Sequence, residues 1–226
     1  ATLERWGRLP RNSERADVSK LGITVQKVQI THNDPVESIT TYLEEHGADL
    51  IVLATDQQKS GIPWLNQSVA TGIARKSREM MLFIPKGLKG FVSLDDGSIS
   101  LKNILIPVAR VPSAQPAVHA VTRMVSGFGC DSGMITLLHV GEEVVTPVAC
   151  PEVAGWRWNR MTKSGDVTES LIQVAREIDA DLIAMTTDGG NGFLDALRGN
   201  HSERVTRESR CPLLTIPVGG WMASVL

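Results

Sequence analysis

Aromatic residues are scarce in this sequence. Phe, Trp and Tyr make up 4% of its 226 residues, with a single tyrosine, and this scarcity argues against a surface on which nucleic-acid bases stack. The formal net charge of −2 gives no electrostatic reason to expect nucleic acid or an acidic membrane as a partner. Long apolar runs are also missing, since none approaches the roughly 18 residues that a membrane-spanning helix needs.

Cysteine is equally sparse. Cys130, Cys150 and Cys211 are odd in number and widely spaced, which fits neither a disulfide framework nor a metal cluster. The polar stretch 1–15 has no apolar core of the kind that signal peptides contain. We therefore expect a cytoplasmic protein with inert thiols and without a resident metal.

What the sequence does contain is an internal repeat. Asp34 recurs as Asp166, 132 positions later, and the segment ADLI at 48–51 returns at 180–183 with the same offset. Leu82, Ile84 and Pro85 also return, as Leu214, Ile216 and Pro217. One ungapped offset over some fifty residues indicates a duplicated structural unit.

Each copy alternates apolar strand patterns with helix patterns. Asp34 and Asp166 are suited to cap helices that run to about Gly47 and Ile178. Short apolar runs, typical of strands covered on both faces, and periodic segments, typical of helices, supply the remaining elements. The expected strands are 25–30, 49–54, 81–84, 102–108, 133–140, 182–185 and 213–217, and the further helices are 67–77, 114–126 and 199–209. Such alternation predicts a parallel, doubly wound α/β sheet.

The first copy is incomplete at its front. Subtracting 132 from Lys102, where the opening strand of the second copy begins, gives a position about thirty residues before Ala1. We therefore expect the first unit to lack its N-terminal strand and helix, and to leave a sheet edge that a partner chain or the missing segment fills. The predicted organisation is a partial domain at 1–86, a linker at 87–101 and a complete domain at 102–219. Asp96-Gly97 predicts a turn in that linker, either within a hairpin with arms at 90–94 and 98–101 or within a plain ordered connection.

Four segments of the second copy resemble the universal stress protein family: ADLI at 180–183, GFLDALRG at 192–199, ERV at 203–205 and CPLL at 211–214. The first copy resembles the same unit more faintly. The resemblance implies two tandem doubly wound domains, and last strands at 81–84 and 213–217 that pair antiparallel as a pseudo-dimer within the chain. Homo-oligomers are the other arrangement that the resemblance implies.

Family members that bind ATP carry a loop of the pattern G-x-x-G-x9-G-[ST]. Glycines in such a loop let the backbone approach phosphates closely. The corresponding positions of the second copy are Thr186, Gly189, Gly199 and Asn200, so two glycines match and two positions depart. The first copy has Ala54, Gln57, Gln67 and Ser68 there, and we expect it not to bind ATP. The acidic residue that follows the first strand in the family is missing, and Arg110 stands beside its place.

Carried over by position, the resemblance implies an ATP site in the second copy, with Mg²⁺ entering only together with ATP. Its expected residues are Pro107, Val108, Ala109, Val140, Thr186, Gly189, Gly199, Asn200, His201 and Ser202. The expected function is a stress-response protein with a regulatory nucleotide, showing at most slow, incidental hydrolysis. The alternative is a nucleotide-independent dimerisation or interaction module with vestigial loops. We expect His139 to be a packed or hydrogen-bonded histidine, and Trp156 and Trp158 to pack in the core or at the sheet edge.

Overall fold

A computed structural model describes residues 2–29, 34–55, 72–73, 76–85, 87–88, 90–142, 147–187 and 211–219. The elements that it describes in full within these ranges are five helices and seven strands, and residues 72–73 and 76 are also helical. These helices and strands are α1 (Thr2–Arg5), α2 (Arg15–Lys20), α3 (Pro35–His46), β1 (Leu50–Thr55), β2 (Met80–Pro85), β3 (Asn103–Val108), α6 (Gln115–Gly127), β4 (Gly133–Val140), β5 (Trp156–Lys163), α7 (Val167–Glu177), β6 (Leu182–Thr187) and β7 (Leu213–Pro217). In this part of the chain, no helix is both long and apolar enough to cross a membrane.

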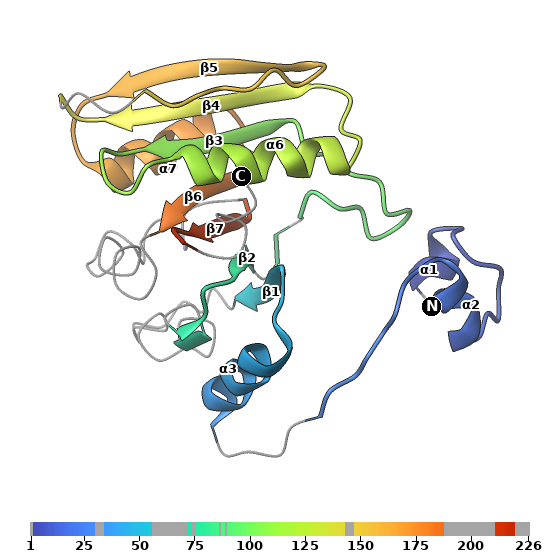
Figure 1. Cartoon of the computed structure of the whole chain (residues 1–226). Helices are drawn as coiled ribbons and strands as arrows, with labels where there is room; N and C mark the ends of the chain where they lie inside the picture. The colour runs from blue at the N-terminus through green and yellow to red at the C-terminus, as the bar shows by residue number, and fades with distance from the viewer. Residues whose placement is uncertain are drawn as a thin grey trace.

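All seven strands belong to one sheet, in the order β1-β2-β7-β6-β3-β4-β5 (Figure 1). Neighbouring strands are parallel except β2 and β7, which run antiparallel. The two halves of the sequence therefore meet at their last strands, and the tandem α/β architecture is confirmed. The expected antiparallel pairing of the two last strands within the chain is confirmed as well.

The register of this central pair follows the internal repeat. Leu82 lies opposite Leu214, and these two residues are the same position of the repeat, 132 residues apart. The flanking pairs, Met81 with Thr215 and Phe83 with Leu213, exchange equivalent positions. A pseudo-two-fold axis consequently passes between Leu82 and Leu214.

The helices that precede β1 and β6 begin as the sequence predicts. The Asp34 carboxylate accepts hydrogen bonds from the backbone N–H groups of Val36 and Glu37, and the Asp166 carboxylate accepts one from the N–H of Glu169. These bonds satisfy donors that would otherwise be free in the first turn. Both helices therefore start at the same position of the repeat.

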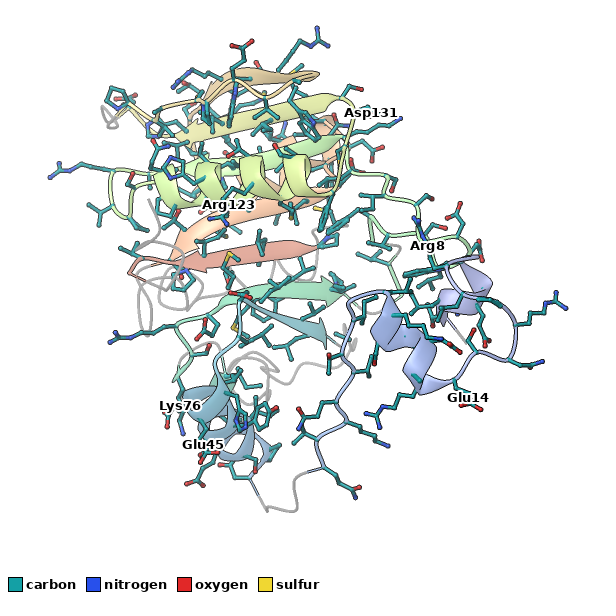
Figure 2. The ribbon with its side chains drawn as sticks, turned by 45° about the vertical axis from the view of Figure 1, so that its right-hand side comes forward. Arg8, Glu14, Glu45, Lys76, Arg123 and Asp131 are labelled. Carbon is teal, nitrogen blue, oxygen red and sulfur yellow. The ribbon has the colours of Figure 1, made fainter. Side chains whose placement is uncertain are left out.

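The core is divided between the two faces of the sheet. One face packs against α6, whose Ala117, Val118 and Val121 are fully buried. The other face packs against α7, and it also holds Ile39 and Leu43 of α3. Figure 2 shows the length of this assembly, with Glu45 of α3 at one end and Asp131, which follows α6, at the other.

The prediction of a strand at residues 25–30 is wrong for residues 25–29, the part of this range that the structure describes. Residues 23–29 form no strand, and Val25 and Val28 are exposed. Their counterparts in the second half lie in β5, which pairs with β4. Among the described residues the first half has no strand equivalent to β4, so this segment has the right residues for a strand but no neighbour to bond.

The predicted turn in the linker is confirmed. Val92 and Ile99 form an antiparallel bridge, and the chain turns at Gly97, where φ is +74°. The indole Nε1–H of Trp6 donates to the carbonyl oxygen of Leu94 at 3.0 Å, and a Cβ on Gly97 would lie 2.7 Å from the Trp6 ring. The hydrogen bond to Leu94 and the packing on Gly97 hold the segment that contains Trp6 against the linker.

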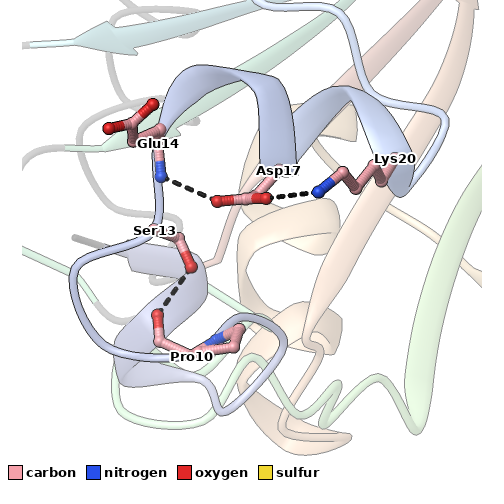
Figure 3. A network of polar contacts seen from close by, with 5 residues as sticks. All are labelled: Pro10, Ser13, Glu14, Asp17 and Lys20. Atoms are coloured by element: carbon pink, nitrogen blue, oxygen red, sulfur yellow. Dashed lines mark hydrogen bonds and ion pairs between the residues drawn. The ribbon is translucent and has the colours of Figure 1, made fainter.

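A small polar network orders the N-terminal helices themselves (Figure 3). The Asp17 carboxylate accepts from the backbone N–H of Glu14 at 2.9 Å and pairs with the Lys20 ammonium at 2.8 Å. The Ser13 hydroxyl donates to the Pro10 carbonyl at 2.7 Å. Because α2 has no buried residue, these local bonds and its caps define the helix.

Cys211, which precedes β7, gives a first testable prediction. Burial, with the nearby Asp181 charge, raises the pKa of its thiol from 9.0 to about 12. We expect this thiol to resist 5,5′-dithiobis(2-nitrobenzoate) at pH 8 in the folded protein, because the thiolate is the reactive form. It should react after the protein is unfolded in urea. The stabilisation of the neutral thiol is full below pH 9 and is lost as the pH rises towards 12. Equal reaction rates for all three thiols of the folded protein would contradict this prediction.

Candidate functional site

The sheet reverses its winding direction between β3 and β6. From β3 the chain passes through α6 to β4 on one side, and it then returns through α7 to β6 on the other side of β3. The two helices cover opposite faces. In open α/β sheets, the carboxyl ends of the strands at such a switch point form a crevice in which ligands bind.

The predicted site residues that are described lie at this end of the sheet. Pro107 and Val108 close β3, with Ala109 directly after them, Val140 is the last residue of β4, and Thr186 lies one residue before the end of β6. The remaining predicted residues lie outside the described residues: Gly189, Gly199, Asn200, His201 and Ser202.

The structure does not bring all five described side chains together. Val108 belongs to the core on the α6 face, whereas Val140 packs against the core on the α7 face. Thr186 faces α6, since its hydroxyl bonds to that helix. Side chains alternate along a strand, so a ligand in the crevice would meet backbone groups at several of these positions.

Thr186 stands where the ATP-binding pattern has its first glycine, and its hydroxyl has a defined partner. The buried Oγ1 accepts a hydrogen bond from the N–H of Ala117, the third residue of α6, at 3.3 Å. The N–H of Gln115 donates to the Ser113 hydroxyl at 3.2 Å, and Pro116 has no N–H. The first three positions of α6 therefore offer no spare donor of the kind that binds a phosphate at a helix N-terminus.

A pocket of about 690 Å³ lies beside this crevice. It opens at the carboxyl ends of β3, β4 and β5, and it combines apolar walls with charged groups. Its lining residues are Val108, Leu137, His139, Gly141, Glu142, Arg160, Met161, Thr162, Lys163 and Ser164.

His139 lines this pocket and is hydrogen-bonded, as expected from the sequence. Its Nδ1 lies 3.1 Å from the carbonyl oxygen of Val108. Because a carbonyl oxygen only accepts, Nδ1 carries the proton, and Nε2 is left as an acceptor in the neutral ring. This Nε2 is buried and has no partner among the described residues. The ring is thus both a structural link between β3 and β4 and an unused acceptor.

Sequence reasoning missed the basic side of the pocket. Arg160 and Lys163 come from β5, and Arg160 also donates to the carbonyl oxygen of Val148 at 3.1 Å. Arg160 and Thr162 alternate along β5 with Met161, and this alternation was the available signal. It could not show that the strand borders a pocket, because that depends on how β5 lies beside β4.

Outside this pocket, the described part of the chain does not assemble a metal site. There, no group of three or more His, Cys, Asp or Glu residues could hold a metal ion. Cys211 is buried in the core, and Arg110 is exposed in the turn after β3. Trp156 is buried, with its indole N–H bonded to the Cys130 carbonyl, and Trp158 packs against the core, as predicted.

Solved structures with this fold include a universal stress protein from Archaeoglobus fulgidus. It shares 18% sequence identity, with 90% of this chain and 72% of that chain covered and a TM-score of 0.64. A second structure, described as a putative universal stress protein from Pseudomonas aeruginosa, shares 14% identity over 89% of this chain and 75% of that chain, with a TM-score of 0.54. A search of curated protein sequences gave no significant match.

The family comparison extends over both halves of the sequence. The family model described as "Universal stress protein family" matches residues 3–85 and residues 157–217. Together these segments make up more than half of the 226 residues, one on each side of the pseudo-two-fold axis. The chain therefore belongs to the universal stress protein family.

Proposed function

We propose that this chain is a regulatory stress-response protein whose second half binds an adenine nucleotide. The observation that carries the proposal is the crevice between β3 and β6, a topological switch point with a pocket of about 690 Å³ beside it. Mononucleotides bind in this position in other doubly wound sheets. The nucleotide acts as a conformational or assembly signal, with hydrolysis slow or incidental.

The base fits beside Val108 and His139. Adenine presents a flat apolar ring and an exocyclic amino group that donates hydrogen bonds. The apolar wall suits the ring. His139 Nε2 is buried and has no partner among the described residues, and it would accept a hydrogen bond from the amino group once the side chains over it move aside. A few polar groups in an apolar pocket commonly fix the orientation of a ligand.

The phosphates bind at the loop that follows β6. The first turn of α6 has no spare donor, since its N–H groups bond to Ser113 and Thr186. Gly189 and Gly199 of that loop match the family pattern, and glycine allows close backbone approach to an anion. Mg²⁺ enters only with the triphosphate.

Calorimetric titration of the chain with ATP and Mg²⁺ tests the proposal. We expect one nucleotide to bind per chain, because the first half has Gln57 and Gln67 where the second half has glycine. Gly189→Gln should abolish the heat of binding, since it introduces a long side chain into the phosphate path. Gly90→Gln is the matched control, because a Cβ on Gly90 meets nothing within 4 Å and the position lies in the linker.

The same titration with GTP probes the base pocket. Guanine has a carbonyl where adenine has its amino group, so His139 Nε2 would face a second acceptor, and we expect binding at least about tenfold weaker. A flat trace with ATP, from a protein that unfolds cooperatively and is therefore folded, would contradict the proposed function.

The alternative function is a nucleotide-independent interaction module. The observation that favours it is that Thr186, which stands in place of the first glycine of the pattern, uses its hydroxyl to accept a hydrogen bond from α6, as expected for a position adapted to stability. Absence of nucleotide binding together with reversible self-association in sedimentation would select this alternative.

A further inference from the structure

Residues 147–155, in the connection from β4 to β5, form a strap on the α6 side of the sheet. Val148 of this strap is buried in the core that α6 also covers. The Arg160 guanidinium of β5 donates to the Val148 carbonyl oxygen at 3.1 Å. Because Arg160 also lines the pocket of about 690 Å³, the position of the strap affects the basic wall of that pocket.

The side-chain amide of Gln115, in the first turn of α6, holds the strap by two hydrogen bonds. Its Nε2 donates to the Ala149 carbonyl oxygen at 3.0 Å, and its Oε1 accepts from the Ala149 N–H at 2.8 Å. A backbone N–H only donates and a carbonyl only accepts, so these two bonds fix which way the amide points. The amide nitrogen also lies 2.9 Å from Nε2 of His119, one turn further along α6.

This arrangement accepts only the neutral form of the His119 ring. Gln115 Nε2 can only donate, so His119 Nε2 accepts, and the ring carries its proton on Nδ1, a buried atom without a partner among the described residues. In the protonated ring two donors would face each other. Turning the amide over would satisfy that ring but would oppose both backbone groups of Ala149. The amide therefore satisfies either Ala149 or a protonated ring, and not both.

We propose that His119 and Gln115 form an acid-sensitive latch that holds the strap at Ala149. Histidine is the side chain that ordinarily changes charge between pH 5 and 8. The latch is closed while the ring is neutral, and it opens as the pH falls and the ring gains a proton. Opening releases Ala149 and loosens the neighbouring contact between Val148 and Arg160. The latch does not depend on the proposed function, whereas its effect on a nucleotide in the pocket does rest on it.

The charged and titratable groups around the latch come from three elements of the described structure. Arg123 lies one turn beyond His119 on α6, and the strap carries Cys150 and Glu152. From β5, the Arg160 guanidinium lies 3.3 Å from the Cys150 sulfur. The two arginines oppose a positive charge on the ring and Glu152 favours one. All three charged groups are exposed and therefore screened by solvent, so the direct contact of the ring with the amide decides the state of the latch.

Nuclear magnetic resonance of the ¹⁵N-labelled chain between pH 8 and pH 5, without nucleotide, tests the latch. We expect the Ala149 amide and the side-chain amide of Gln115 to shift with the same midpoint as the His119 ring. Protection of the Ala149 amide from hydrogen exchange, corrected for the intrinsic effect of pH on exchange, should fall about fivefold, as expected for one lost hydrogen bond. The Trp156 amide, which donates to the Val153 carbonyl at the far end of the strap, should keep its protection.

Three variants identify the groups involved. His119→Gln places a neutral acceptor oxygen beside Gln115, so Ala149 should stay protected and its amide should no longer respond to pH. His46→Gln is the matched control, because His46 is exposed on α3, and Ala149 should titrate in it as in the parent. Gln115→Ala removes the latch, so the Ala149 amide should lose protection about fivefold already at pH 8. This third variant keeps the test decisive even where His119→Gln fails to fold.

The proposal is overturned by an Ala149 amide that does not respond while the His119 ring titrates. An equal response of Ala149 in His119→Gln, or unchanged protection of Ala149 in Gln115→Ala, would overturn it as well. Because no nucleotide is present, none of these results bears on the proposed nucleotide site, and a flat titration with ATP would leave the latch intact.

Discussion

Replacing Leu214 with aspartate is expected to abolish cooperative folding of the chain or to lower its free energy of unfolding by about 4 kcal/mol or more. Leu214 is 4% exposed and faces Leu82 at the pseudo-two-fold axis. An aspartate there would bury an unpaired carboxylate in the contact that joins the two halves of the sheet. Urea denaturation followed by circular dichroism measures the effect.

Leu94→Asp is the control for this substitution. The same change of residue type at a side chain that is 73% exposed should alter the free energy of unfolding by no more than about 0.5 kcal/mol. A loss below about 1 kcal/mol for Leu214→Asp would show that β7 is not packed between β2 and β6 as described.

The second large effect is expected at Gly155, which enters β5. Its φ is +76°, and a Cβ there would lie 1.8 Å from the carbonyl oxygen of Asp131. Gly155→Ala should therefore cost about 3 kcal/mol or more, because both the strain and the backbone overlap are unfavourable. The required shift would also break the bond from the Gly133 N–H to the Gly155 carbonyl. Thermal and urea unfolding measure the loss.

Gly129→Ala separates the two contributions. Gly129 has a similar φ of +63°, but a Cβ there meets nothing within 4 Å. Only backbone strain remains, so we expect a loss of about 1 kcal/mol. Equal losses for the two variants would mean that Gly155 and Asp131 are not in close approach.

The central architecture could be predicted because the repeat constrains it. The single offset of 132 residues places Leu82 and Leu214 at the same repeat position, and two equivalent strands that pair antiparallel about a two-fold axis put equivalent positions on either side of that axis. Which equivalent pair lies on the axis is known only from the structure. The N-terminal caps at Asp34 and Asp166 were also predictable, because a capping side chain acts on backbone groups only two or three residues away.

Other features depend on contacts that a local pattern does not contain. Residues 25–30 have the composition of a strand, yet strand formation requires a neighbour, and the described first half has none in that place. The site was predicted only partly, for a similar reason. The positions of Val108 and Thr186 at one end of the sheet follow from topology, whereas the pocket beside His139 and Arg160 depends on how β5 lies beside β4.

Nuclear magnetic resonance of the ¹⁵N-labelled chain, titrated with ATP and Mg²⁺, tests the central functional claim most directly. We predict shift changes for the backbone amides at the carboxyl ends of β3, β4 and β6, including Val108, His139 and Thr186, and none along β1. The first half has Gln57 and Gln67 where the second half has Gly189 and Gly199, so the signal should be confined to the second half. Unchanged spectra at saturating nucleotide, or changes centred on β1 and β2, would contradict the account.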